Sequence, residues 1–121
     1  MPRARDPPVR EIAVFGGSAH PALTAEICAH LTVPQRPVLL KRFANDCLEV
    51  QLQSNCRERD VFLIQPLVYP VQEHLVELLL MADAARGASA ARVTAVMPHW
   101  ASGCPGRGGR WSRPGLLRFR R

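Results

Sequence analysis

The 121-residue chain lacks the features that mark several large classes of protein. No apolar run reaches the roughly 20 residues that a membrane-spanning helix needs, so we expect no membrane partner. Residues 1–11 contain no apolar core region and therefore do not form a secretory signal. The four cysteines include no C-x-x-C pair, which favours reduced thiols over a disulfide scaffold. Together these absences predict one globular domain in the cytoplasm.

Motifs of several enzyme classes are missing as well. The sequence contains no nucleophile elbow, no H-E-x-x-H helix and no pair of carboxylates placed for acid–base chemistry. Cys47, Cys56 and His99 do not have the spacing of a zinc site, and His74 has no partner at metal-ligand spacing. From the residues alone we assign no catalytic residue and no metal ligand.

Charge is distributed unevenly along the chain. Residues 1–100 carry ten basic and ten acidic side chains, so the net charge of +6 comes from six arginines after Ser102. The segment 101–121 has no hydrophobic periodicity and consists mostly of Gly, Arg, Ser and Pro. Its composition is typical either of an out-of-frame reading of GC-rich DNA or of a basic extension that binds nucleic acid in a salt-sensitive way. We do not expect nucleic acid to be a partner.

Apolar runs alternate with amphipathic stretches over residues 11–98 and predict an α/β fold. The expected strands lie at 12–15, 38–40, 48–52, 61–64 and 93–97. A helix is expected over 21–31, and a second from Pro70 to a left-handed stop at Gly87. We predict a mainly parallel five-stranded sheet with helices on both faces, a flexible lead-in over 1–10 and an irregular, disordered Arg/Gly-rich tail over 99–121.

The second helix has an expected apolar face and an expected polar side. The apolar face is formed by Val71, Leu75, Leu78, Leu79 and Ala82. The residues off that face are Gln72, Glu73 and Glu77.

The glycine-containing segment Gly16 to His20 joins the first strand to the first helix. Free backbone N–H groups and the helix dipole could hold a phosphate there. The alternative is a tight turn whose glycines supply positive φ angles. The segment lacks both the dinucleotide fingerprint and the Gly-Lys-Ser/Thr of a P-loop, so spacing alone leaves both interpretations open.

Two further segments could bind a nucleotide or a phosphate. Phe43 and Asn45 lie between two expected strands, where a ring beside an amide could stack on a purine and bond its edge. The same residues also suit a hairpin in which Asn45 and Asp46 form the turn and Phe43 covers the core. Arg57 belongs to an Arg-Glu-Arg-Asp run that is either a solvated loop or the source of a phosphate clamp.

A set of short segments, taken in order, resembles one known family. The segments are FGGSAHP (15–21), RFAN (42–45), VQL (50–52), RERDVFLIQ (57–65), VQEHLVELLLM (71–81), AARGASA (84–90) and RVTAVMP (92–98). Together they resemble the N-terminal domain of ribose-phosphate pyrophosphokinase (phosphoribosyl pyrophosphate synthase). The resemblance is collinear and nearly gapless over residues 11–98.

The resemblance implies a phosphoribosyltransferase-like fold and a function. Members of the family transfer the diphosphate of MgATP to ribose 5-phosphate and assemble as homo-oligomers. Phe43 and Asn45 match positions that contact the ATP adenine from a neighbouring subunit, and Arg57 matches an arginine that binds regulatory phosphate or ADP. ATP and Mg²⁺ are therefore the implied cofactors.

The chain also departs from the family pattern. Cys47 stands where the family has a third adenine contact, a glutamate, and Asn55 stands where many members have a serine. After Pro98 the family's cationic loops, metal-binding histidine and ribose-phosphate loop do not follow. We therefore expect an incomplete, truncated ribose-phosphate diphosphokinase that is inactive alone and binds ATP poorly. The alternatives are a non-catalytic subunit that associates with full-length synthase and a nucleic-acid binder acting through its basic tail.

Overall fold

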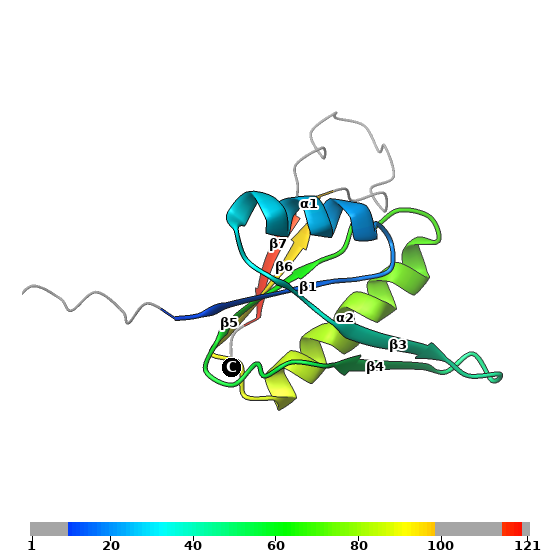
Figure 1. The fold of residues 1–121 in the computed structure, drawn as a ribbon. Helices are drawn as coiled ribbons and strands as arrows, with labels where there is room; N and C mark the ends of the chain where they lie inside the picture. Colours follow the sequence, from blue (N-terminus) through cyan, green and yellow to red (C-terminus); the bar gives the residue numbers. More distant parts are fainter. Residues whose placement is uncertain (1–9, 99–114, 120–121) are drawn as a thin grey trace, which may run out of the picture.

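The computed structural model describes residues 10–98 and 115–119, which form two helices, a large sheet and a separate hairpin (Figure 1). The strands are β1 (Ile12–Gly16), β2 (Gln35–Arg36), β3 (Val38–Arg42), β4 (Leu48–Leu52), β5 (Asp60–Ile64), β6 (Arg92–Met97) and β7 (Gly115–Phe119). The helices are α1 (Pro21–Leu31) and α2 (Val71–Gly87). Neither of these described helices combines the length and the hydropathy of a bilayer-crossing segment. Strands that alternate with helices confirm the predicted α/β class.

The large sheet has the strand order β2-β1-β5-β6-β7. Its first four strands run parallel to one another, and β7 runs antiparallel to β6. The apolar sequences of β1, β5 and β6 suit this arrangement because the central strands of a parallel sheet are covered on both faces. A mainly parallel five-stranded sheet is therefore present, as the sequence predicts.

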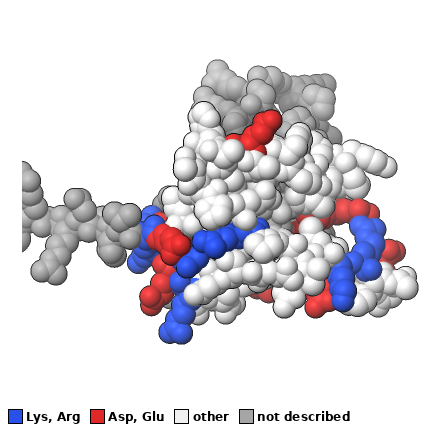
Figure 2. Space-filling model, viewed as in Figure 1, with Lys and Arg blue, Asp and Glu red and all other residues white. Residues whose placement is uncertain are grey.

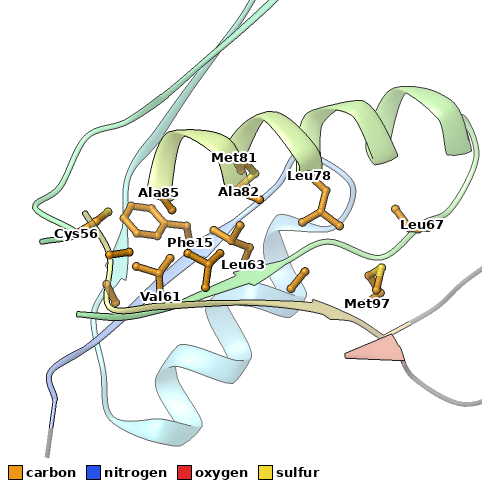
Figure 3. Packing of buried hydrophobic residues seen from close by; sticks show 14 residues of the cluster. Phe15, Cys56, Val61, Leu63, Leu67, Leu78, Met81, Ala82, Ala85 and Met97 are labelled. Carbon is orange, nitrogen blue, oxygen red and sulfur yellow. The ribbon is translucent and has the colours of Figure 1, made fainter. Parts of the chain in front are cut away.

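Alternate side chains of the central strands enter two different cores. On one face, Phe15 of β1 and Leu63 of β5 join Met81 of α2 in the main core (Figure 3). On the other face, Val14 of β1 packs with Cys28 of α1 in a smaller core. The two helices thus cover opposite faces of the sheet, which confirms the predicted layers.

The strands of the large sheet are not all the predicted ones. The segments expected as strands at 38–40 and 48–52 pair with each other as the antiparallel hairpin β3–β4, which extends away from the sheet (Figure 1). Half-buried and exposed residues alternate along both strands, so the hairpin has one apolar face. That face packs on the core beside α2, whereas a central strand of the sheet would need two apolar faces. The short strand β2 and the strand β7 take the edge positions instead.

Part of the segment predicted to be an irregular tail is a strand. Residues 115–119 form β7 beside β6, although GLLRF lacks the regular apolar–polar alternation that marks a half-buried strand in sequence. An open sheet edge pairs through backbone groups, so it accepts a segment that its side chains do not mark as a strand. The predictions for residues 1–9, 99–114 and 120–121 lie outside the described residues.

Helix α2 buries most of its predicted apolar face, with two exceptions. The predicted residues that lie in or against the main core are Val71, Leu75, Leu78 and Ala82. Glu77, expected off the apolar face, is only 5% exposed, and Leu79, expected on it, is 49% exposed. The buried stripe runs through Glu77, Met81 and Ala85, which follow one another at intervals of four residues. A carboxylate can occupy this stripe because the loop between β1 and α1 supplies its hydrogen-bond donors.

The end of α2 also differs from the expectation. Gly87 is the last helical residue and does not have a positive φ. The left-handed residue is Ser89, with a φ of 62°, two positions further along. The chain therefore turns from α2 toward β6 through a serine rather than through the glycine.

Candidate functional site

The turn of the hairpin β3–β4 carries both predicted adenine contacts, Phe43 and Asn45. The Phe43 N–H donates to the Cys47 carbonyl over 2.9 Å, and the Asp46 N–H donates to the Phe43 carbonyl over 3.0 Å. The Asn45 Oδ1 accepts the Cys47 N–H over 3.3 Å. Asp46 has a φ of 61°, a left-handed value that aspartate adopts more readily than most residues. The segment 42–47 therefore folds into a closed turn that presents Phe43 and Asn45 together.

Both side chains are accessible at this turn. Phe43 is 48% exposed, and Asn45 is exposed as well. Since the Asn45 Oδ1 accepts a backbone N–H, the amide Nδ2 is the group that can donate to an acceptor on a purine. The hollow of about 390 Å³ between the hairpin and α2 is lined by Arg42, Asp46 and Glu73 among others, but not by Phe43 or Asn45. A base stacked on Phe43 would therefore lie outside this hollow. The turn would cover only one face of that base.

One ion pair connects the end of β3 to the first turn of α2. The Arg42 guanidinium contacts the Glu73 carboxylate at two points, with Nη2–Oε2 and Nη1–Oε1 distances of 2.7 and 3.3 Å. This two-point contact holds both side chains in one geometry. The hydrogen bond from Arg42 lowers the pKa of Glu73, and the same contact raises the pKa of Arg42. Both side chains are half-exposed, so water and salt screen the pair.

Arg57, the predicted regulatory-phosphate residue, lies in the loop between β4 and β5. Its backbone N–H donates to the Asn55 Oδ1 over 3.0 Å. The residue is exposed, and among the described residues no carboxylate lies within ion-pair distance of its guanidinium. Two other arginines near this loop, Arg36 and Arg59, both pair with Glu11. Arg57 is thus a cation that a phosphate can approach.

The structure does not bring Arg57 and the adenine candidates into one site. Phe43 and Asn45 lie at the turn of the hairpin, whereas Arg57 follows the other end of β4. In the view of Figure 2 charged side chains gather at two separate places, over the hairpin turn and near the start of β1, with mostly uncharged surface between them. The hairpin and the loop with Arg57 are therefore two distinct candidate sites.

A buried carboxylate occupies the loop that could have held a phosphate. The side chain of Glu77 accepts the backbone N–H of Ser18, and its Oε2 accepts the Ser18 hydroxyl over 2.7 Å. Gln65, which is fully buried, donates from Nε2 to the Glu77 Oε1 over 3.1 Å. The anion at this loop is thus a side chain of the protein itself.

The other N–H groups of the loop also donate within the domain. The Gly17 N–H donates to the Ile64 carbonyl over 3.0 Å, and the Ala19 N–H donates to the Gln65 Oε1 over 3.2 Å. Because the N–H groups of residues 17–19 are all engaged, they cannot cradle an external phosphate in this conformation. The structure supports the turn interpretation of this segment.

The two glycines of the loop are needed for space and not for a left-handed backbone. Neither Gly16 nor Gly17 has a positive φ, which corrects the expected reason for their presence. A Cβ at Gly17 would overlap the side chain of Gln65, and a Cβ at Gly16 would lie 2.5 Å from the Thr24 Oγ1. Gln65 and Thr24 are both fully buried, so neither can move aside without disturbing its surroundings.

Three residues in and around this loop have structural roles that the sequence analysis did not predict. His20 caps α1, since its Nδ1 accepts the Leu23 N–H over 3.0 Å. Gln65 directly follows an apolar strand, where its polarity could have signalled a contact at the strand end. Glu77 lies four residues before Met81 on the buried stripe, and a charge at that spacing was a signal for a buried partner.

The described residues do not offer a metal site. Within 10–98 and 115–119, no three His, Cys, Asp or Glu side chains are arranged to hold an ion. The implied Mg²⁺ therefore has no matching donor set there, and no step is assigned to it. Cys28, Cys47 and Cys56 form no disulfide among the described residues, and Cys104 lies outside them. Burial raises the pKa of the Cys28 and Cys56 thiols.

Comparison with known proteins assigns these features to a family. Residues 12–103 match the family model for the N-terminal domain of ribose phosphate pyrophosphokinase. The chain belongs to the ribose-phosphate pyrophosphokinase family. This membership confirms the resemblance seen in the sequence, and it places the hairpin, the Gly16 loop and the loop with Arg57 inside the matched range.

Named relatives of the family extend well beyond this chain. A Streptomyces coelicolor protein that carries the family's name is 73% identical over 92 residues, which cover 76% of this chain and 29% of that protein. The ribose-phosphate pyrophosphokinase of Parasynechococcus marenigrum is 50% identical over 94 residues, which cover 78% and 28%. The crystal structure of phosphoribosylpyrophosphate synthetase from Mycobacterium smegmatis superposes with a TM-score of 0.71 at 32% identity, covering 74% and 30%. The chain thus spans less than a third of these relatives.

Replacing Gly17 by alanine tests the close packing of the loop. We expect Gly17→Ala to lower the free energy of unfolding by about 1–3 kcal/mol, because the new Cβ overlaps buried Gln65. Gly87→Ala is the matched control, since nothing lies within 4 Å of its added Cβ and alanine favours the helix by up to about 1 kcal/mol. Urea unfolding measures both variants. Equal stability of the two would contradict the packing argument.

Removing the guanidinium of Arg42 tests the ion pair. We expect Arg42→Gln to raise the pKa of Glu73 toward the ordinary value, because the hydrogen bond that lowers it is lost. The pair stabilises the fold above the ordinary glutamate pKa, and this contribution disappears as the pH falls through the lowered folded value. An NMR titration of the Glu73 carboxyl carbon measures the shift. Lys41→Gln, which removes a neighbouring charge, should leave Glu73 unchanged, and an unshifted Glu73 in Arg42→Gln would refute the assignment.

Proposed function

We propose that this chain serves diphosphoryl transfer from ATP to ribose 5-phosphate as an N-terminal-domain subunit that presents an adenine-binding hairpin and does not catalyse the transfer alone. The observation that carries this proposal is the closed turn at residues 43–47, which holds an aromatic ring and an amide together at the surface. Membership in the ribose-phosphate pyrophosphokinase family supports the reaction class.

The exposure of the turn favours a site shared between subunits. Phe43 can stack on one face of an adenine, and the Asn45 Nδ2 can donate to a ring nitrogen at its edge. The turn itself provides no second wall, since the neighbouring hollow is lined by other residues. A second copy of this chain or a full-length synthase subunit would complete the pocket.

Cys47 weakens the proposed adenine contact. Its backbone closes the turn, because its N–H and carbonyl bond to Asn45 and Phe43. Its thiol is a weaker acceptor than the carboxylate that the family resemblance leads us to expect at this position. We therefore propose that the hairpin keeps its shape and holds the base by stacking and one amide, with lower affinity than a turn that also carries a glutamate.

Arg57 is proposed as a contact for a regulatory phosphate. Its exposed guanidinium has no ion-pair partner among the described residues, and a phosphate oxygen is the ligand that such a group binds best. Asn55 supports this role indirectly, since its Oδ1 accepts the Arg57 N–H and shapes the loop. Arg57 follows the other end of β4 from the turn with Phe43, so this phosphate site would be separate from the base.

Catalysis requires groups that residues 10–98 do not supply in one place. Diphosphoryl transfer depends on positioning the reactants and on neutralising the charge of the phosphates. In this proposal Arg57 serves a regulatory phosphate, and three other arginines pair with carboxylates: Arg42 with Glu73, and Arg36 and Arg59 with Glu11. The chain then contributes to a shared nucleotide site while another subunit provides the catalytic groups.

The chain alone should show no turnover. We expect no AMP from ATP, Mg²⁺ and ribose 5-phosphate with the purified 121-residue chain, because residues 10–98 and 115–119 hold no metal-ligand cluster and three of their arginines already pair with carboxylates. A coupled assay for AMP measures this, with an intact family synthase as the positive control. Turnover that scales with the concentration of the chain would refute the proposed incompleteness.

Mixing the chain with a disabled synthase tests the shared site. The disabled protein is a full-length family synthase in which the residue aligned with Phe43 is replaced by alanine. Its affinity for ATP should rise when this chain is added. We expect the KM for ATP to fall about tenfold, the worth of one base stacked on an aromatic ring. Phe43→Ala in this chain should abolish the rescue, whereas Leu39→Ala, at another exposed position of β3, should preserve it. Equal rescue by Phe43→Ala would contradict the role of the ring.

A further inference from the structure

The two edges of the large sheet are protected in different ways. At one edge, β2 is only two residues long, and Pro34 and Pro37 flank it, so it offers few backbone groups to another strand. Without β7, the other edge of the sheet would be β6, a six-residue strand whose only charged residue is Arg92, at its start. Shortness and proline therefore protect the β2 edge, whereas β6 has no comparable device in its own sequence.

The strand β7 closes the edge of β6. It pairs antiparallel with β6 over five residues, from Val93 opposite Phe119 to Met97 opposite Gly115. β7 also lies beyond residues 12–103, the part of the chain that matches the family. The family likeness therefore does not account for this pairing, which belongs to the chain's own terminal segment.

The direction of the backbone groups of β6 follows from a hydrogen bond on its other side. The Gln65 N–H donates to the Val96 carbonyl over 3.0 Å, so the backbone groups of Val96 point toward β5. Successive residues of a strand direct their backbone groups to opposite neighbours. Val93, Ala95 and Met97 therefore direct theirs toward β7, and the register places Leu117 opposite Ala95.

We propose that the edge of β6 is a binding site for an extended peptide segment in antiparallel orientation, and that β7 is its occupant within the same chain. Recognition is through the backbone groups of Val93, Ala95 and Met97, which a strand of many sequences can satisfy. Their side chains are buried under α2, so the edge stays in place whether or not it is occupied. A competing extended segment can then displace β7 without unfolding the core.

Two neighbouring proline substitutions test this assignment in the full chain. Leu117→Pro removes the N–H that we expect to face Ala95, whereas Leu116→Pro removes one that faces away from β6. We expect Leu117→Pro to speed amide hydrogen exchange of Val93, Ala95 and Met97 by about tenfold or more. The amides of Thr94 and Val96, which face β5, should remain slow in the same sample.

Three control variants and the possible outcomes of the exchange experiment each support or refute the proposal. Leu116→Pro, Leu116→Ala and Leu117→Ala should all leave the three amides slow, because each keeps the N–H of residue 117. Fast exchange in both proline variants would refute the assigned register. If the amides of Leu117→Pro stay slow, sedimentation velocity decides: a dimer means that a second copy occupies the edge, which supports the binding site but overturns β7 as its occupant, and a monomer overturns the whole proposal.

Adding the segment as a separate peptide tests binding directly. A synthetic peptide of residues 113–121 is titrated into the Leu117→Pro chain, with the same peptide carrying proline at position 117 as its matched control. We expect the first peptide to restore slow exchange at Ala95 in a saturable way and the second to have no effect. An equal effect of both peptides, or none from either, would show that the edge does not bind an extended segment.

Discussion

A carboxylate inside a protein must find hydrogen-bond donors, and Glu77 finds them in the loop between β1 and α1. Ser18 provides two donors and Gln65 a third, so α2, the loop and the end of β5 form one unit. Leaving such a buried group unpaired costs about 1–3 kcal/mol or more, which fixes the position of α2. That position in turn determines where the hairpin packs and where Glu73 meets Arg42.

The elements that depend on local sequence could be predicted. Pro21 and the four-residue spacing of apolar side chains gave α1 its observed bounds, Pro21–Leu31, and the central strands follow their apolar runs. Which strands share a sheet depends on partners far away in sequence, so β3, β4 and β7 were misplaced. The burial of Glu77 was missed for the same reason, because two of its three donors, both on Ser18, lie 59 residues earlier.

The candidate site was predicted in its residues but not in its geometry. The hairpin and adenine interpretations of Phe43 and Asn45 were alternatives in sequence, yet the folded turn satisfies the hairpin and exposes the ring at once. Composition could not show that the Gly16 loop already holds an internal anion. The order of the turn, the strand at 48–52 and Arg57 did place Arg57 beyond the other end of β4, but the sequence could not show which arginines of this region pair with Glu11.

The hairpin separates the proposed base contacts from the buried cores. Its turn residues, from Phe43 to Cys47, are exposed and belong to neither buried core. A mutation there leaves the packing beneath α2 and α1 intact, so a change at the proposed base contacts carries little cost to folding. The cysteine at position 47 illustrates this freedom: the turn retains its backbone bonds around a side chain of different chemistry, and selection can explore such exchanges one at a time.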